Sequence, residues 1–289
     1  MMIRIGVLIV WLLHFLPLSV LARFGNGLGS FFYVVARERR NVADINLRLC
    51  FPDMDQAERS RLVRRHFQVF ARSFLERGIL WWSSAERIKK LVRIEGEEHF
   101  RAANGKPLII LSAHFVAFEV GGYWLTMQTG AVDVYTKQKN RYVDAFLLKK
   151  RARFGHQLLY SRQEGMRPVI KAVREGRPLY YLMDQDVSVK DGMFVPFFGV
   201  QAATLTTLPR LVEITGAKIV PCITRVLPGG DGYETRFYPA WDNYPSGDAE
   251  ADTRRVNEFI EQRVLEMPEQ YFWVHKRFKT RPEGEAKYY

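Results

Sequence analysis

The run from Leu108 to Met127 constrains the fold of this chain more than any other stretch. Its first part, Leu108–Leu111, is a short continuous apolar segment after the turn-forming residues Asn104–Pro107, as expected for a buried strand. A second apolar segment, Phe118–Met127, has the length of a buried helix. Because only a few residues separate the two, the chain must pass directly from a strand into a helix, which is typical of an α/β sheet.

A histidine and a glutamate stand at the junction of these segments. His114 falls in the predicted strand-to-helix turn, and Glu119 falls in the first turn of the predicted helix. Five residues turn an ideal helix by about 500°, so the two side chains meet only if Glu119 reaches back toward a His114 that precedes the helix. The carboxylate would then fix the imidazole tautomer and leave the other ring nitrogen as a general base. The alternative is a buried histidine beside an unrelated glutamate.

Strands and helices alternate along most of the chain. We expect further strands at residues 132–135, 179–183, 218–224 and 233–238, and helices at about residues 39–50, 56–80, 142–154, 165–174, 204–215 and 252–267. Pro221 suggests an edge strand or a bulge, since proline cannot donate a ladder hydrogen bond. The alternation predicts one α/β domain over residues 25–289, with a mixed sheet flanked by helices, behind an N-terminal anchor at residues 1–24.

The anchor is an apolar segment, Ile5–Ala22, that is about long enough to cross a bilayer. It is longer than the core of a usual signal peptide, and the chain after it is basic and poor in cysteine, so we favour an anchor over a cleaved leader. The basic residues that follow favour a cytoplasmic main body. His14 and Pro17 leave open whether the segment spans the membrane or lies in its interface. Gly25–Gly29 then reads as a small-residue packing stretch beside the anchor.

The charge of the chain points to anionic partners. Lys and Arg number 43 against 31 Asp and Glu, a net charge of +12, which suits nucleic acid, an anionic membrane surface, or an acidic protein or substrate. The only cysteines, Cys50 and Cys222, are far apart, which argues against a disulfide framework and fits a reduced compartment. The sequence contains no phosphate-binding loop, no dinucleotide fingerprint and no Gly-x-Ser-x-Gly elbow.

Two groups of charged residues and two aromatic stretches can each be interpreted in two ways. Asp184 and Asp186 follow a predicted strand at the sheet edge where ligands sit, but no second cluster supports a metal pair, so we expect no metal and no cofactor. Four basic residues on one predicted helix form either a solvated face or a docking surface for a phosphate or an acidic carrier protein: Lys149, Lys150, Arg151 and Arg153. Trp81-Trp82 and Met193–Gly199 are either core or contacts to membrane or acyl chain.

A histidine base without a protein nucleophile implies that the substrate supplies the nucleophile. The expected reaction is deprotonation of an acceptor hydroxyl, which attacks an activated acyl group directly while cations or N–H groups stabilise the oxyanion.

Motifs along the whole chain then resemble one family. The His114-x4-Glu119 pattern after an apolar strand is similar to the HX4D/E motif of the glycerolipid acyltransferase superfamily. More narrowly, the chain resembles the late lauroyl/myristoyl acyltransferases of lipid A biosynthesis. The matching features are Asn46–Pro52, His114-Phe115 with Glu119, Asn140 with Asp144, Gly155 with Arg162, Asp184–Asp186 with Phe194–Gly199, Gly216-Ala217 with Pro221, and Gln270–Gly284.

The resemblance implies a glycerol-3-phosphate-acyltransferase-like domain, anchored on the cytoplasmic face of the bacterial inner membrane. Its partners would be acyl carrier protein as donor and a Kdo-bearing lipid A precursor, whose hydroxyl accepts the acyl chain. By position, His114 would be the base and Glu119 its orienting carboxylate. The implied substrate-binding residues are Asn140, Arg162, which would bind phosphate or developing charge, and Asp184 and Asp186, which either contact substrate or support their loop.

Other functions stay open at this stage. The acceptor could be a lysophospholipid, an ornithine lipid or a glycolipid, and a non-enzymatic protein that binds membrane or nucleic acid would also be basic.

Overall fold

The computed structural model describes residues 2–155 and 157–289. The strands are β1 (Val92–Glu95), β2 (Leu108–Ser112), β3 (Val132–Tyr135), β4 (Leu158–Ser161), β5 (Leu179–Leu182), β6 (Gly192–Phe197), β7 (Val200–Leu205), β8 (Lys218–Val226) and β9 (Tyr233–Phe237). The α-helices are α1 (Met2–Leu13), α2 (Leu18–Val35), α3 (Arg37–Cys50), α4 (Gln56–Trp82), α5 (Ala85–Leu91), α6 (Glu97–Ala103), α7 (Phe118–Thr129), α8 (Arg141–Arg151), α9 (Arg167–Arg174), α10 (Thr207–Thr215) and α11 (Ala249–Glu266).

The core is a seven-stranded sheet of order β1-β9-β8-β2-β5-β3-β4. All neighbouring strands are parallel except β8 and β9, so the predicted α/β fold with a mixed sheet is confirmed. Every residue of β2 is buried, as expected for a strand covered on both faces. Because β2 pairs in parallel with β5, and β5 with β3, the carboxyl ends of these strands lie along one edge of the sheet.

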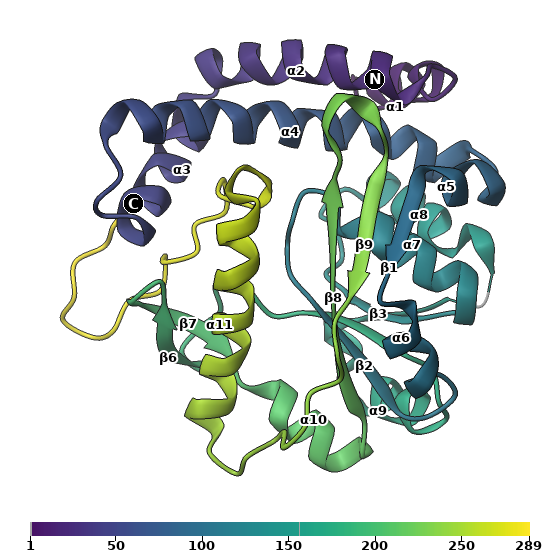
Figure 1. Cartoon of the computed structure of the whole chain (residues 1–289), viewed down its shortest axis with the longest axis vertical. Helices are drawn as coiled ribbons and strands as arrows, with labels where there is room; N and C mark the ends of the chain where they lie inside the picture. Colours follow the sequence, from purple (N-terminus) through teal and green to yellow (C-terminus); the bar gives the residue numbers. More distant parts are fainter. Residues whose placement is uncertain (1, 156) are drawn as a thin grey trace.

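Alternate residues of β2 face two separate apolar cores. Ile109 and Leu111 pack with buried residues of α9, α10 and α11, whereas Leu108 and Ile110 pack with those of α5, α6 and α7. The sheet is therefore flanked by helices on both faces, and α11 stands beside β8 and β9 in Figure 1.

The N-terminal segment forms two helices instead of one. α1 ends at Leu13, residues 14–17 form a turn, and α2 runs to Val35, so the predicted boundary at residue 24 falls inside a helix. Figure 1 shows α2 lying along α4 across one end of the molecule. The predicted packing role of the small-residue stretch is confirmed: a Cβ on Gly25 would come within 2.5 Å of Arg72, and one on Gly29 within 2.4 Å of Gln68. Among the described helices, α2 alone is long and apolar enough to cross a membrane.

One local expectation, the edge position of Pro221, is corrected. Pro221 lies in β8, which is an interior strand between β2 and β9. The strand accommodates proline because Pro221 is the last residue paired with β2, and pairing with β9 begins at Cys222. Residues 192–205 form the hairpin β6–β7, whose Val195 and Phe197 are fully buried. Part of the aromatic stretch is therefore core.

The C-terminal segment packs along the site edge of the sheet without regular structure. Trp273 and Phe278 are buried, and Asn46 of α3 donates to the carbonyls of Trp273 and His275 at 2.7 Å. Gln270 is hydrogen-bonded to both the N–H and the carbonyl of Val226. These contacts hold the segment in one position beside the carboxyl ends of β2 and β5.

Candidate active site

His114 lies where the sequence predicts, in the turn between β2 and α7, and its side chain is 20% exposed. Asp184 follows β5, the neighbour of β2, and its side chain is 1% exposed. One carboxylate oxygen accepts the backbone N–H of His114 at 2.9 Å, and the other lies 2.7 Å from the imidazole Nδ1. An ionised carboxylate only accepts hydrogen bonds, so Nδ1 carries the proton. Nε2 is left with its lone pair free to take up a proton.

The electrostatics of Asp184 fit this arrangement. Burial would raise the pKa of its carboxyl group, but the interaction with His114, the two hydrogen bonds and Arg277 together hold that pKa below its usual value. The carboxylate therefore stays ionised and fixes both the position and the tautomer of the imidazole.

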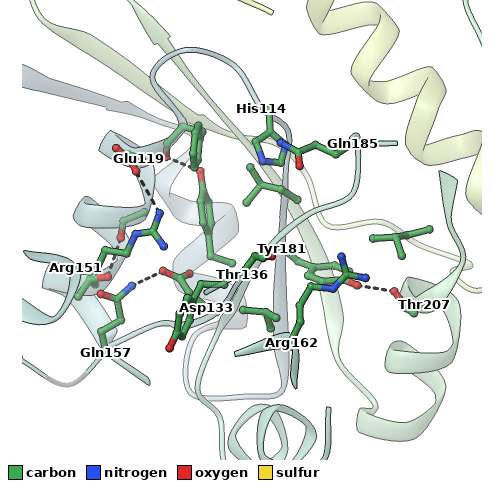
Figure 2. A pocket seen from close by; sticks show the side chains of 18 of the residues that line it. His114, Glu119, Asp133, Thr136, Arg151, Gln157, Arg162, Tyr181, Gln185 and Thr207 are labelled. Carbon is green, nitrogen blue, oxygen red and sulfur yellow. Dashed lines mark hydrogen bonds and ion pairs between the residues drawn. The ribbon is translucent and has the colours of Figure 1, made fainter. Parts of the chain in front are cut away.

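The expectation that Glu119 orients His114 is wrong. Glu119 does lie in the first turn of α7, but its carboxylate pairs with Arg77 of α4 at 2.8 Å and with Arg151 of α8 at 3.4 Å. Figure 2 shows this carboxylate directed to Arg151, away from the imidazole. Burial would raise the pKa of Glu119, and the two guanidinium groups lower it below the usual value. Both side chains line the same pocket, but each has its own ion-pair partner there.

The loop from Asp184 to Asp186 is fixed by the C-terminal segment. The N–H of Asp186 donates to Nε2 of His275 at 3.0 Å, and its carboxylate accepts from the N–H and hydroxyl of Thr280 at 2.9 and 3.0 Å. Burial lowers the pKa of His275 to about 4, so its ring is neutral and can accept that bond. Of the two acids, Asp184 holds His114 and Asp186 ties the loop to the segment.

A pocket of about 470 Å³ opens in front of His114. Figure 2 shows the imidazole on one wall, with Glu119, Arg151, Asp133 and Gln157 on another. Gln157 donates a hydrogen bond to Asp133, and burial raises the pKa of that carboxyl group to about 6. The sequence interpretation missed both residues. The available signal was a lone carboxylate in the predicted strand 132–135.

The other predicted substrate-binding residues differ in their placement. Arg162, just after β4, is exposed and lines the pocket, and the described part of the chain offers its guanidinium no hydrogen-bond or ion-pair partner. Asn140 instead caps α8, because its side-chain oxygen accepts the N–H groups of Tyr142 and Val143.

Most of the predicted docking cations are held by the protein itself. Three of them lie in α8, and Arg153 lies in the short 3-10 helix that follows it. Lys150 donates to the carbonyl of Trp81 and lies over the ring of Trp82, and Arg153 donates to two carbonyls at the end of α4. Arg151 is bonded to Glu119, so only Lys149 of the four is exposed. The two half-buried tryptophans form part of this contact between α4 and α8.

Within residues 2–155 and 157–289, no three His, Cys, Asp or Glu side chains gather as a metal site requires. The chemistry that the side chains themselves support is proton transfer by a carboxylate-held imidazole next to a pocket whose lining includes the guanidinium of Arg162, which is unpaired within the described chain.

Comparisons with known proteins find similarity over almost the whole chain. Residues 1–280 match the family described as bacterial lipid A biosynthesis acyltransferase. The chain is 33% identical over 283 residues to the lipid A biosynthesis lauroyltransferase of Escherichia coli, covering 97% of this chain and 92% of that protein. It is 32% identical over 277 residues to the lipid A biosynthesis myristoyltransferase of the same organism, covering 93% and 83%. A crystal structure of the 1-acyl-sn-glycerophosphate acyltransferase PlsC from Thermotoga maritima aligns at a TM-score of 0.40 with 13% identity, covering 86% of this chain and 97% of that one.

Proposed function

Because the chain belongs to the bacterial lipid A biosynthesis acyltransferase family, we propose that it moves a fatty acyl chain from acyl carrier protein to a hydroxyl group of a Kdo-bearing lipid A precursor. The family establishes an acyltransferase of lipid A biosynthesis. The donor, the acceptor and the chemical mechanism are the proposal. The observation that carries it is the His114–Asp184 pair at the pocket, with Nδ1 occupied and Nε2 free.

In the proposed reaction His114 is the general base. Nε2 takes the proton of the acceptor hydroxyl as its oxygen attacks the thioester carbonyl carbon, and Asp184 stabilises the imidazolium that forms. The tetrahedral intermediate then collapses, the C–S bond breaks, and the imidazolium returns the proton to the leaving thiolate. An ester and a free carrier thiol result, and no acyl group is ever attached to the protein.

A cation on the pocket wall that pairs with no other described residue supports an anionic lipid as acceptor. Arg162 is exposed on the pocket wall with no partner in the described chain, as a residue that receives a phosphate group would be. The net charge of +12 suits a phosphorylated lipid, an acidic carrier protein and anionic headgroups alike.

The carrier protein docks, in this proposal, beside α8. Arg141 and Lys149 are exposed on that helix, and Lys137 and Lys139 are exposed on the segment that leads into it. That segment borders the pocket at Thr136 and Gln138, so a carrier bound there could deliver its thioester to the site.

For the membrane we propose an anchor that lies in the interface on the cytoplasmic face of the inner membrane. With 18 residues, α2 is about 27 Å long and could span a bilayer by length alone. Its inner face, however, is packed on α4 through Gly25 and Gly29, and α4 carries eight charged residues that cannot enter the hydrocarbon core.

The outer faces of α1 and α2 are apolar and uncovered. Phe24, Phe31 and Val35 of α2 are 58%, 58% and 51% exposed, and Leu12 of α1 is 55% exposed. A helix pair with one face on the protein and an apolar face outward inserts into a single leaflet. Bromolipid quenching of labels on Phe24→Cys and Val35→Cys tests this orientation. We expect equal, shallow depths, whereas a spanning helix would place residue 24 near the bilayer centre and residue 35 near its surface.

The catalytic proposal is tested with the His114→Ala variant. We expect at least about a hundredfold loss of acyl transfer, the contribution of a general base, in a protein that stays folded and membrane-bound. Mass spectrometry of lipid A from a deletion strain should show the loss of one secondary acyl chain, restored by the wild-type gene and not by His114→Ala. An unchanged lipid A, with a different lipid altered, would contradict the proposed acceptor.

A further inference from the structure

Gln185, between Asp184 and Asp186, has a side-chain amide group without a hydrogen-bond partner in the described part of the chain. Gln185 is half-buried and lines the pocket, and no residue in the described part of the chain forms a hydrogen bond with its side chain. Figure 2 shows this side chain beside the imidazole of His114. A side-chain amide carries two N–H donors and one acceptor oxygen, and here all of them are available to a ligand.

The backbone that carries Gln185 is fixed on both sides. Asp184 is bonded to the backbone and ring of His114, and its carbonyl lies 3.5 Å from the hydroxyl of Tyr271. Asp186 is bonded through its N–H to His275 and through its carboxylate to Thr280. A donor on such a loop needs little reorganisation when charge develops nearby, which is the condition for electrostatic stabilisation of a transition state.

The cationic groups of the pocket are placed differently. The Arg151 guanidinium is bonded to Glu119, and Figure 2 shows Arg162 on the wall near Tyr181 and Thr207, across the pocket from His114. Of the side-chain donors that Figure 2 labels, Gln185 is the one drawn next to the imidazole that activates the nucleophile.

We propose that Gln185 is a catalytic residue that donates an N–H to the oxyanion of the tetrahedral intermediate. This inference rests on the proposed function. As the acceptor oxygen bonds to the thioester carbon, the carbonyl π electrons move onto its oxygen, and the Gln185 amide donates to that oxygen. When the C–S bond breaks, the carbonyl re-forms and the thiolate takes the proton held by His114. The amide gains and loses no atom.

The test compares Gln185→Met, which keeps the size of the side chain and removes its N–H donors, with Gln185→Glu, which keeps an acceptor oxygen and also removes the N–H donors. Steady-state kinetics use acylated carrier protein and the lipid A precursor. We expect kcat to fall about 10²- to 10³-fold in both variants, the usual effect of removing one oxyanion donor, with KM for both substrates little changed. Binding of a tetrahedral phosphonate analogue of the donor should weaken by a similar factor, and binding of an unreactive thioether analogue should not.

Two outcomes would overturn the inference. One is a kcat in Gln185→Met close to that of the wild type. The other is a higher KM for the lipid with an unchanged kcat, which would make Gln185 a residue that binds the acceptor. His114→Ala, measured in parallel, distinguishes a failure of the general-base mechanism from a failure of the role of Gln185. If His114→Ala is inactive and Gln185→Met is fully active, the general-base mechanism stands and the role of Gln185 is refuted.

Discussion

Replacing Asp184 with asparagine should disable the base without disturbing substrate binding. In the wild type, one carboxylate oxygen accepts the backbone N–H of His114 at 2.9 Å and the other accepts from Nδ1 at 2.7 Å. An asparagine can reproduce only one of these acceptors. If its oxygen keeps the backbone bond, its NH₂ group faces Nδ1, which must then hold a lone pair. The proton moves to Nε2, and the imidazole can no longer take one from the acceptor hydroxyl.

The expected loss is large. An Asp→Asn change that leaves a catalytic histidine in the wrong tautomer costs about 10⁴ in kcat in a serine protease, equivalent to about 5 kcal/mol of transition-state stabilisation. We expect a loss of 10³- to 10⁴-fold on that scale in Asp184→Asn. KM for both substrates should change little, because the Asp184 side chain is only 1% exposed and cannot touch them.

The assay combines steady-state kinetics with ¹⁵N NMR of the imidazole nitrogens. Glu119→Gln is the matched control, since it removes the same charge from a half-buried carboxylate that pairs with Arg77 and Arg151 instead of the imidazole. We expect the His114 tautomer to change in Asp184→Asn and to stay as in the wild type in Glu119→Gln. A folded Asp184→Asn enzyme whose kcat is within tenfold of the wild type would refute the reasoning, as would a tautomer change in Glu119→Gln.

Three further outcomes follow from the same structure. Gly29→Leu should separate α2 from α4 and lower the thermal unfolding temperature, because its Cβ would lie 2.4 Å from the α4 backbone, whereas Gly27→Leu, with no atom within 4 Å, should not. The free energy of unfolding should fall as the pH drops from 6.5 towards 4, because His275 takes up a proton in the unfolded chain but not in the folded protein, where its pKa is about 4. In His275→Gln, the thermal unfolding temperature should depend less on pH across this range. Lys149→Glu should raise KM for acylated carrier protein at low salt and much less at high salt, and a salt-independent KM would argue against docking beside α8.

The sequence predicts the elements around the site well because their signals are local. The buried run of β2 and the apolar α7 follow each other directly, so the position of His114 in the turn could be inferred from the chain alone. Local sequence patterns likewise indicate the strands β3 and β5 and the start of α4 at its N-cap Asp55.

The partner of His114 could not be inferred in this way. Asp184 is 70 residues away, and it meets His114 only because β5 pairs with β2 in the sheet. Strand order is set by packing of the whole domain, and no local pattern encodes it. Glu119 was the nearer carboxylate in sequence, but two arginines from α4 and α8 compete for it more strongly.

The same reason explains the cations of α8. Their spacing in the sequence indicated a basic helix face. Which of them pair with other parts of the protein, as Lys150 does with Trp82, depends on where the end of α4 lies in the fold. The break between α1 and α2 was signalled by His14 and Pro17, and the small residues of α2 indicated that it packs closely, but no local pattern identified α4 as its partner.

The contacts of Asp186 with His275 and Thr280 have a consequence for biosynthesis. A nascent chain that has emerged from the ribosome as far as Asp186 already contains His114 and Asp184, but His275 and Thr280, which hold their loop in place, have yet to be translated. The candidate active site is therefore completed late in translation, well after α1 and α2 have left the exit tunnel. A premature stop codon before residue 275 would leave a polypeptide with every proton-transfer group encoded and the brace missing.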